Sequence, residues 1–200
     1  MPKQAPNLTH LAELIEKHRT GREPQAAPQW EFDPEACPDF PFRIARDGKW
    51  YYHGSPIDRK ELCKLFSSVL RRDAKGNFYL VTPVEQGRIE VEDAPFTAVE
   101  TIVTGEGRSR SVTFRTNLDH MITAGAAHPI RVAEDPETGE PSPYVLVRDG
   151  LEALILRPQF YELVELCEER QDGDMTALGL WSDGVFFELG KVGENTEDES

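Results

Sequence analysis

The chain has 200 residues, 38% of them hydrophobic and 29% charged, with a formal net charge of −14. This length allows one large domain or two of about 100 residues each. No segment approaches the ~18 consecutive apolar residues that a membrane span needs, and no signal-peptide pattern follows Met1. We therefore expect a soluble, cytoplasmic protein that has no membrane partner.

The negative charge is concentrated toward the C-terminus. Residues 40–131 carry 14 basic and 11 acidic side chains, whereas residues 132–200 carry 4 basic and 18 acidic ones. Because binding to nucleic acid needs many uncompensated Lys and Arg side chains, this balance argues against a nucleic-acid partner. A small anion facing the weakly basic middle segment is allowed. Alternatively, that segment docks on the acidic second half or is neutralised by local ion pairs.

Familiar catalytic and cofactor motifs are absent from the sequence. No nucleotide-binding or hydrolase signature occurs, so the sequence identifies no cofactor and no catalytic residue. The five histidines have no ligand spacing to one another or to cysteine, and we predict no metal site. The three cysteines are too few and too scattered for a disulfide framework, so we expect them to be reduced.

The first 41 residues are predicted to be an appended segment. Asn7 can cap an amphipathic helix that ends at Gly21. Residues 24–41 hold five prolines and should form an extended linker, which Trp30 and Phe32 pin to the body. The apolar positions of the helix follow the i, i+3, i+4, i+7 spacing: Leu8, Leu11, Ala12 and Ile15.

Residues 42–96 predict a first α+β domain. A hairpin turns at Asp47-Gly48, and a helix follows with Ser55 as N-cap and Pro56 as its first residue. We expect this helix to run through Leu70, which places Arg71 and Arg72 in its last turn. The expected strands are 42–45, 50–52, 77–82 and 87–91.

Residues 97–192 predict a second α+β domain, followed by an acidic tail at 193–200. Its helix begins at Pro158, its last hairpin turns at Asp183-Gly184, and residues 135–143 form a surface loop. The expected strands are 97–104, 111–116, 121–123, 130–132, 144–147, 151–156, 177–181 and 185–189.

Three landmarks recur in the same order in both domains, at offsets of 102, 102 and 104 residues. They are an Arg-Asp-Gly turn, a helix-opening proline and a helical Glu-Leu-Cys. This recurrence predicts internally duplicated β-β-α-β-β units in a mostly antiparallel α+β fold. The landmarks are Arg46-Asp47-Gly48 and Arg148-Asp149-Gly150, Pro56 and Pro158, and Glu61-Leu62-Cys63 and Glu165-Leu166-Cys167.

The densest polar stretch runs from Glu85 to Asp93. Strand alternation places Arg88, Glu90 and Glu92 on the face opposite Ile89. Carboxylates on one face can act as an acid and base pair. Such a face is more often solvated and held by cross-strand ion pairs. Similarly, Arg71 and Arg72 either present guanidinium groups to an anion or interact with a helix dipole.

Several motifs together resemble the bacterial domain-of-unknown-function family 1285. The resemblance runs from about Phe40 to Gly190. Its motifs are Trp50, Gly54-Ser55-Pro56-Ile57, Leu70-Arg71-Arg72-Asp73, Leu80-Val81-Thr82-Pro83-Val84-Glu85, Gly87-Arg88-Ile89, Val91-Glu92-Asp93-Ala94-Pro95-Phe96, Phe114-Arg115-Thr116-Asn117, Ala127-His128-Pro129 and Tyr144-Val145-Leu146-Val147-Arg148-Asp149-Gly150-Leu151.

The resemblance implies a duplicated two-domain fold whose C-terminal domain is superficially like pleckstrin-homology folds. It also implies a nucleotide-like ligand between the domains and a role in signalling. We therefore expect a non-enzymatic module that binds a small anionic ligand at the domain boundary. Its candidate ligand-binding residues are Arg72, Glu85, Arg88, Glu92, Asp93, Arg115, Asn117, His128 and Arg148, with Arg88 as the first choice.

Two other functions stay open. The protein is an interaction adaptor if the N-terminal helix or the acidic tail binds a protein partner. It is a carboxylate-dependent enzyme acting on a phosphorylated or sugar substrate if Glu85, Glu90, Glu92 or Asp93 has a catalytic or metal-binding role. The absence of a paired His, Cys or Ser nucleophile argues against the enzyme.

Overall fold

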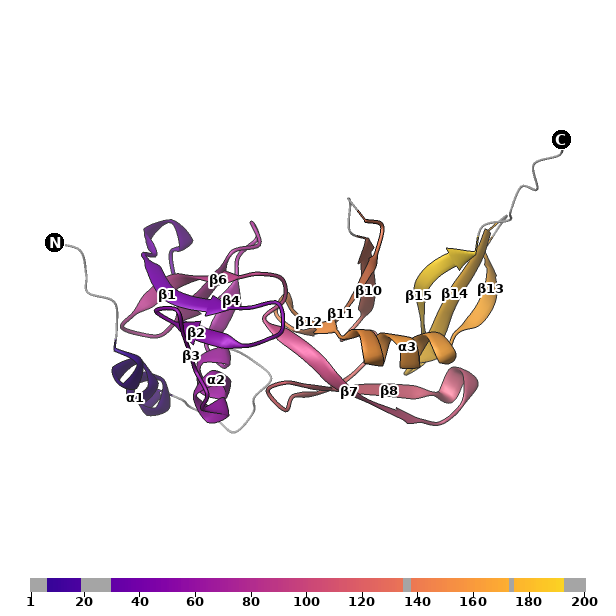
Figure 1. Ribbon diagram of the computed structural model, residues 1–200, viewed down its shortest axis with the longest axis horizontal. Helices are drawn as coiled ribbons and strands as arrows, with labels where there is room; N and C mark the ends of the chain where they lie inside the picture. Colours follow the sequence, from indigo (N-terminus) through magenta and orange to yellow (C-terminus); the bar gives the residue numbers. More distant parts are fainter. Residues whose placement is uncertain (1–6, 19–29, 135–137, 173–174, 193–200) are drawn as a thin grey trace. The chain divides into compact units, whose positions relative to one another are not determined.

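The computed structural model describes residues 7–18, 30–134, 138–172 and 175–192. The chain divides into two compact units, whose elements can be followed in Figure 1. The first unit contains the described residues up to Phe96 together with Arg148–Leu151, and the second contains the other described residues. The expected α+β class, with two domains and mostly antiparallel sheet, is confirmed. The predictions for Gly21, for the prolines before residue 30 and for the acidic tail lie outside the described residues.

The first unit is built on one six-stranded sheet, in the order β3-β2-β1-β6-β5-β4. Neighbouring strands are antiparallel except β1 and β6, which run parallel. The parallel pair joins the N-terminal hairpin to the strands that follow the helix α2 (Lys60–Ser67). The strands are β1 (Asp39–Ile44), β2 (Trp50–Tyr52), β3 (Ser55–Pro56), β4 (Leu70–Arg72), β5 (Phe78–Val81) and β6 (Gln86–Val91).

The predicted N-terminal helix is present as α1 (Leu8–His18). The Asn7 side chain accepts a hydrogen bond from the Thr9 N–H at 3.0 Å, as an N-cap does. Leu11 and Ile15 are fully buried, and α1 packs against α2 in the same unit. The apolar face read from the spacing is therefore the face that the fold covers.

The helix α2 (Lys60–Ser67) begins later and ends earlier than expected. Ser55 and Pro56 form the short strand β3 instead of the helix start, since Pro56 pairs with Tyr51 on β2. Arg59 is the N-cap residue, and Arg71 and Arg72 lie on β4. The helix-dipole explanation of these two arginines is therefore wrong.

The core of the first unit is aromatic. The ring of Phe66 on α2 lies 5.2 Å from that of Phe42 on β1 and 6.4 Å from that of Trp50 on β2. All three side chains are at most 2% exposed.

The linker before β1 contacts the sheet at two places. Phe32 contacts Tyr79 at 5.4 Å between ring centroids, and Arg71 donates a hydrogen bond to the Trp30 carbonyl at 2.9 Å. The linker is thus pinned to the sheet by Trp30 and Phe32, as expected. A 3-10 helix, η1 (Pro34–Ala36), lies between that contact and β1.

The second unit contains a six-stranded sheet, in the order β10-β11-β12-β7-β8-β9, and a separate three-stranded sheet, β13-β14-β15. Its helix α3 (Arg157–Glu165) begins next to the predicted Pro158, and η2 (Gly107–Ser109) connects β7 to β8. The strands are β7 (Phe96–Thr104), β8 (Ser111–Thr116), β9 (Met121–Thr123), β10 (Ile130–Glu134), β11 (Pro141–Arg148), β12 (Leu151–Ile155), β13 (Glu168–Asp172), β14 (Met175–Ser182) and β15 (Val185–Val192).

The recurring sequence landmarks correspond to a recurring order of elements but not to a recurring strand order. Each segment contains a hairpin, a helix and further strands. In the first segment every strand joins one sheet, because β1 pairs with β6. In the second, β10 and β7 occupy the two edges of the β11–β12 hairpin, so β13–β15 form a sheet of their own. The two segments therefore do not form equivalent sheets.

A glycine on β6 is required by close packing. A Cβ atom at Gly87 would lie 2.1 Å from the ring of Phe40, so Gly87→Ala must displace that ring from the surface of β6. We predict that the substitution lowers the free energy of unfolding by about 1–3 kcal/mol, measured by guanidinium denaturation. The control Gly190→Ala, where the added Cβ meets no atom within 4 Å, should change stability by less than about 0.5 kcal/mol. Equal effects of the two would contradict the packing argument.

A buried serine ties the two sheets of the second unit together. The Ser182 hydroxyl accepts a hydrogen bond from the Val112 N–H at 2.9 Å and donates one to the Ala124 carbonyl at 2.7 Å. Ser182→Ala leaves both backbone groups without these partners, so we predict a loss of about 1–3 kcal/mol in the free energy of unfolding. Ser109→Ala, at an exposed hydroxyl on η2, is the matched control and should cost less than about 0.5 kcal/mol. A loss at Ser182 no larger than this would show that the buried hydroxyl is dispensable.

Candidate functional site

The nine predicted site residues are divided between the two units. The three in the second unit are held by local contacts. Arg115 pairs with Glu100 and Asp119 across and along the β8 face. The Asn117 side chain accepts the Thr97 N–H at 3.1 Å, and Nδ1 of His128 lies 3.0 Å from the Leu146 carbonyl. The other six lie in the first unit: Arg72, Glu85, Arg88, Glu92, Asp93 and Arg148.

Glu92 and Asp93 bind cationic side chains of β1 and the turn after it. Glu92 accepts hydrogen bonds from the Arg46 backbone N–H and from the Arg43 guanidinium. These two bonds, the backbone one first, lower the pKa of Glu92. Asp93 pairs with Arg46 at 3.2 Å. Both carboxylates therefore have partners within the unit.

Glu85 lies in the turn between β5 and β6. Its backbone N–H and carbonyl both bond to Thr82, which closes the turn. Among the described residues, its Oε2 atom is buried and has no hydrogen-bond partner. The contacts that the structure gives Glu85 are therefore those of a turn residue.

Three arginines surround the turn at Arg148–Leu151, and we call Arg71, Arg72 and Arg148 the arginine cluster. Arg148 is only 7% exposed. Its Nη2 donates to the Ser67 carbonyl, and its Nη1 lies 3.8 Å from the Asp149 carboxylate. Within the described part of the chain, Nε and Nη1 of Arg148 make no hydrogen bond. The guanidinium therefore has unused donors in a buried position.

The other two arginines are fixed around this group. Nη1 of Arg72 donates to the Gly150 carbonyl at 3.1 Å, and its guanidinium lies 5.6 Å from the ring centroid of Phe78. Arg71 lies over the ring of Phe32 at 5.5 Å. Arg72 thus contacts the turn that carries Arg148, and Arg71 interacts electrostatically with Asp149 of that turn.

Burial lowers the pKa of Arg148, and the Asp149 carboxylate partly opposes this effect. Arginine nonetheless stays protonated in proteins. A buried cation without full hydrogen bonding is costly, and an anion that supplies oxygen acceptors removes that cost. The cluster is therefore a place where an anion would bind favourably. Arg72 and Arg148 are among the nine predicted ligand-binding residues. Arg71 is not among them, although the sequence offered Arg71 and Arg72 alike as an anion contact or as helix-end residues.

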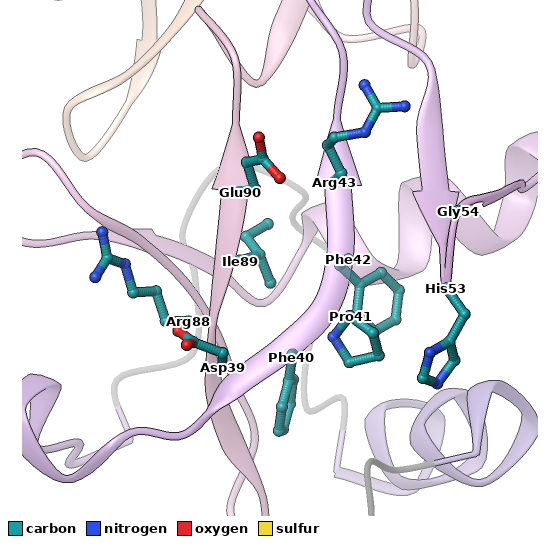
Figure 2. Close-up of a pocket in the computed structure, with 10 residues that line it drawn as sticks. All are labelled: Asp39, Phe40, Pro41, Phe42, Arg43, His53, Gly54, Arg88, Ile89 and Glu90. Atoms are coloured by element: carbon teal, nitrogen blue, oxygen red, sulfur yellow. The ribbon is translucent and has the colours of Figure 1, made fainter.

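A second candidate is an open groove on the first sheet, with a volume of about 580 Å³. It lies where β1 bulges away from β6 between Asp39 and Arg43. Figure 2 shows Glu90 and His53 toward opposite ends of the groove, with the guanidinium groups of Arg43 and Arg88 pointing away from each other. Its lining is Asp39, Phe40, Pro41, Phe42, Arg43, His53, Gly54, Arg88, Ile89 and Glu90.

Of the residues that line the groove, only Arg88 is among the nine predicted ligand-binding residues, and Glu90 was a candidate only for the enzyme alternative. A proline within a strand of aromatic and apolar residues is a signal for a bulge. Pro41, between Phe40 and Phe42, could therefore have located the groove.

In the described ranges, no three His, Cys, Asp or Glu side chains come together as metal ligands. No helix in the described part of the chain is long and apolar enough to cross a membrane.

The fold is that of a two-domain α+β protein, and both candidate sites contain arginine side chains. The chain belongs to the DUF1285 family. Residues 27–94 match the N-terminal domain of this family, a domain of unknown function, and residues 95–189 match the C-terminal domain of the same family of unknown function. The family resemblance read from the sequence is therefore confirmed.

Two solved structures of the family are similar to this chain. A DUF1285 family protein from Silicibacter pomeroyi DSS-3 is 46% identical, covers 94% of this chain and 97% of its own, and has a TM-score of 0.79. One from Shewanella baltica OS155 is 25% identical, covers 62% of this chain and 91% of its own, and has a TM-score of 0.50. A comparison with curated proteins gives no match.

The buried guanidinium of Arg148 gives a prediction about stability without ligand. Arg148→Met keeps most of the apolar stem and removes the buried charge, at the cost of the bond to Ser67. We predict a free energy of unfolding within about 1 kcal/mol of wild type, because the two effects oppose each other. Arg148→Ala, which also removes the stem, should be less stable than Arg148→Met. A loss above about 3 kcal/mol for Arg148→Met, measured by chemical denaturation, would mean that the guanidinium serves the fold alone.

Proposed function

We propose that the protein is a non-enzymatic binding module for a small anionic, nucleotide-like ligand, which the arginine cluster holds, and that it acts in signal transduction. The observation that carries the proposal is the buried Arg148 guanidinium with its unused Nε and Nη1 donors. A phosphate group accepts paired hydrogen bonds from such a planar fork. The nucleotide class and the signalling role come from the family resemblance.

Arg148 replaces Arg88 as the first choice for the anion. Arg88 is exposed on β6, where water solvates its charge, and it lies in a groove that also contains Asp39 and Glu90. An anion there would face two carboxylates. At the arginine cluster the nearby carboxylate is that of Asp149, whose side chain is 63% exposed. Binding an anion therefore relieves more unfavourable free energy at Arg148 than at Arg88.

The enzyme alternative is weaker for two of its four candidate carboxylates, because these two have other partners. Glu92 and Asp93 are paired with Arg43 and Arg46. Burial also raises the pKa of Cys63 to about 11, so this thiol is a poor nucleophile at neutral pH. The ion pairs of Glu92 and Asp93 and the raised pKa of Cys63 therefore favour a binding function over an enzymatic one.

The adaptor alternative is weaker for the N-terminal helix. The apolar face of α1, with Leu11 and Ile15, is already buried within its own unit. A protein partner would therefore meet the polar face of this helix. Binding of a protein partner by the acidic tail, residues 193–200, stays an open alternative.

Calorimetric titration tests the proposed function. Nucleoside mono- and diphosphates and sugar phosphates are screened by thermal shift, with and without Mg²⁺, because a ligand that binds only the native state raises the melting temperature. For the best ligand, Arg148→Met should weaken binding by at least ~10-fold, as expected for the loss of charge-assisted hydrogen bonds. Arg72→Ala should weaken it less, because the Arg72 guanidinium is exposed.

Two variants serve as controls. Arg88→Ala removes a cation of the same unit outside the cluster, and Arg157→Ala removes an exposed arginine that pairs with Glu140. Both should bind the anion as wild type does. If Arg148→Met binds as tightly as wild type while Arg88→Ala loses binding, the anion site belongs to Arg88 and the assignment to the cluster is overturned. If no phosphate compound binds wild type, the proposed function fails.

A further inference from the structure

The groove on the first sheet contains charges of both signs that lack partners. Among the described residues, the side chains of Asp39, Arg88 and Glu90 make no hydrogen bond or ion pair. Three other carboxylates on or next to the strands of this protein are paired across strands: Glu92 with Arg43, Glu100 with Arg115 and Glu152 with Arg131. The strands of this protein can therefore form cross-strand ion pairs, but Asp39, Arg88 and Glu90 in the groove form none.

The absence of an ion pair at Glu90 has a local cause on β1. Arg43 is the cross-strand neighbour of Glu90. Its guanidinium instead bonds to Glu92 and stacks on the ring of Tyr51, 4.1 Å from the ring centroid. Glu90 is therefore left without the cation that the strand register places opposite it. Figure 2 shows Glu90 lying between the diverging guanidinium groups of Arg43 and Arg88.

The second cross-strand pair, Asp39 and Arg88, is also unpaired although the two residues face each other across the parallel strands. A simple anion in the groove would be attracted by the guanidinium of Arg88 but repelled by the carboxylates of Asp39 and Glu90. A simple cation would gain the two carboxylates but would be repelled by Arg88. A ligand that carries both charges close together satisfies all three side chains.

We propose that the groove binds a zwitterionic α-amino acid. The ligand carboxylate accepts the two-pronged hydrogen bonds of Arg88. The ligand ammonium, which has three donors, binds the carboxylates of Asp39 and Glu90. The ligand's side chain lies along Pro41, so apolar and aromatic amino acids are preferred.

The size and chemistry of the groove agree with this ligand class. A volume of about 580 Å³ lies within the roughly 300–1,000 Å³ of small-molecule sites, which combine apolar walls with a few polar groups. The proposal does not depend on the arginine cluster, since the groove shares no residue with it.

L-Phenylalanine is the test ligand, titrated into the full chain by calorimetry and by NMR shift changes. L-Phenylalaninamide, which lacks the carboxylate, and N-acetyl-L-phenylalanine, which lacks the ammonium, should each bind at least ~10-fold more weakly, the effect of losing one charge-assisted interaction. The absence of saturable phenylalanine binding, or equal binding of all three compounds, would overturn the proposal.

Two variants assign each charge to its side chain. Arg88→Ala should weaken phenylalanine binding by at least ~10-fold without changing the affinity for the amide, because the amide has no carboxylate to lose. Glu90→Gln should weaken phenylalanine binding without changing the affinity for the acetylated compound. Arg148→Met, a variant outside the groove, should bind phenylalanine as wild type does, so this result is separable from failure of the proposed anion site. If Arg88→Ala weakens phenylalanine and its amide equally, Arg88 does not hold the carboxylate and the proposal is wrong.

Discussion

The first unit depends on the parallel pairing of β1 with β6. Every other neighbouring pair in that sheet joins strands that are adjacent along the chain, and only this pair closes a long segment that contains α2. Forming it costs the most chain entropy of any pairing in the sheet. The aromatic packing of Phe42 and Trp50 against Phe66 on α2 compensates for that cost, because it holds the helix over the β1–β2 hairpin.

The same pairing explains the positions of the charges. The register between β1 and β6 shifts between Asp39 and Arg43, and the two strands place Asp39 next to Arg88 and Arg43 next to Glu90. Arg43 reaches Glu92, and Glu90 is left open to the groove. A protein with a net charge of −14 can therefore present local cationic and zwitterionic sites, because binding responds to the nearest groups more than to the total charge.

Strong local patterns were read correctly from the sequence. The Asn7 cap and the apolar spacing placed α1, and the Asp149-Gly150 and Asp183-Gly184 turns have the positive φ angles expected of tight hairpins. β2, β8 and β9 have the residues predicted for them. These features depend on neighbours close in sequence, so one chain is enough to reveal them.

The parts that were missed depend on partners far away in sequence. Ser55 and Pro56 have the signature of a helix start, yet pairing with β2 makes them a strand. Arg71 and Arg72 continue an apparently helical pattern but lie on β4, opposite Phe78 and Tyr79. The burial of Arg148 depends on contact with Ser67, 81 residues earlier. Arg148 belongs to the repeated Arg-Asp-Gly motif and was one of the nine candidates, but no local pattern states which of its nitrogens lack a partner.

The turn at Arg148–Leu151 belongs to the first unit although the strands on either side of it belong to the second. The polypeptide therefore passes from one unit to the other three times. A fragment that ends at Phe96 would keep every strand of the first sheet but would lack Arg148 and the Gly150 carbonyl that Arg72 binds. Cutting the chain between the two family domains, at residues 94 and 95, would distribute the arginine cluster over two polypeptides. Both family domains therefore contribute side chains to the arginine cluster, and neither domain contains the whole cluster by itself.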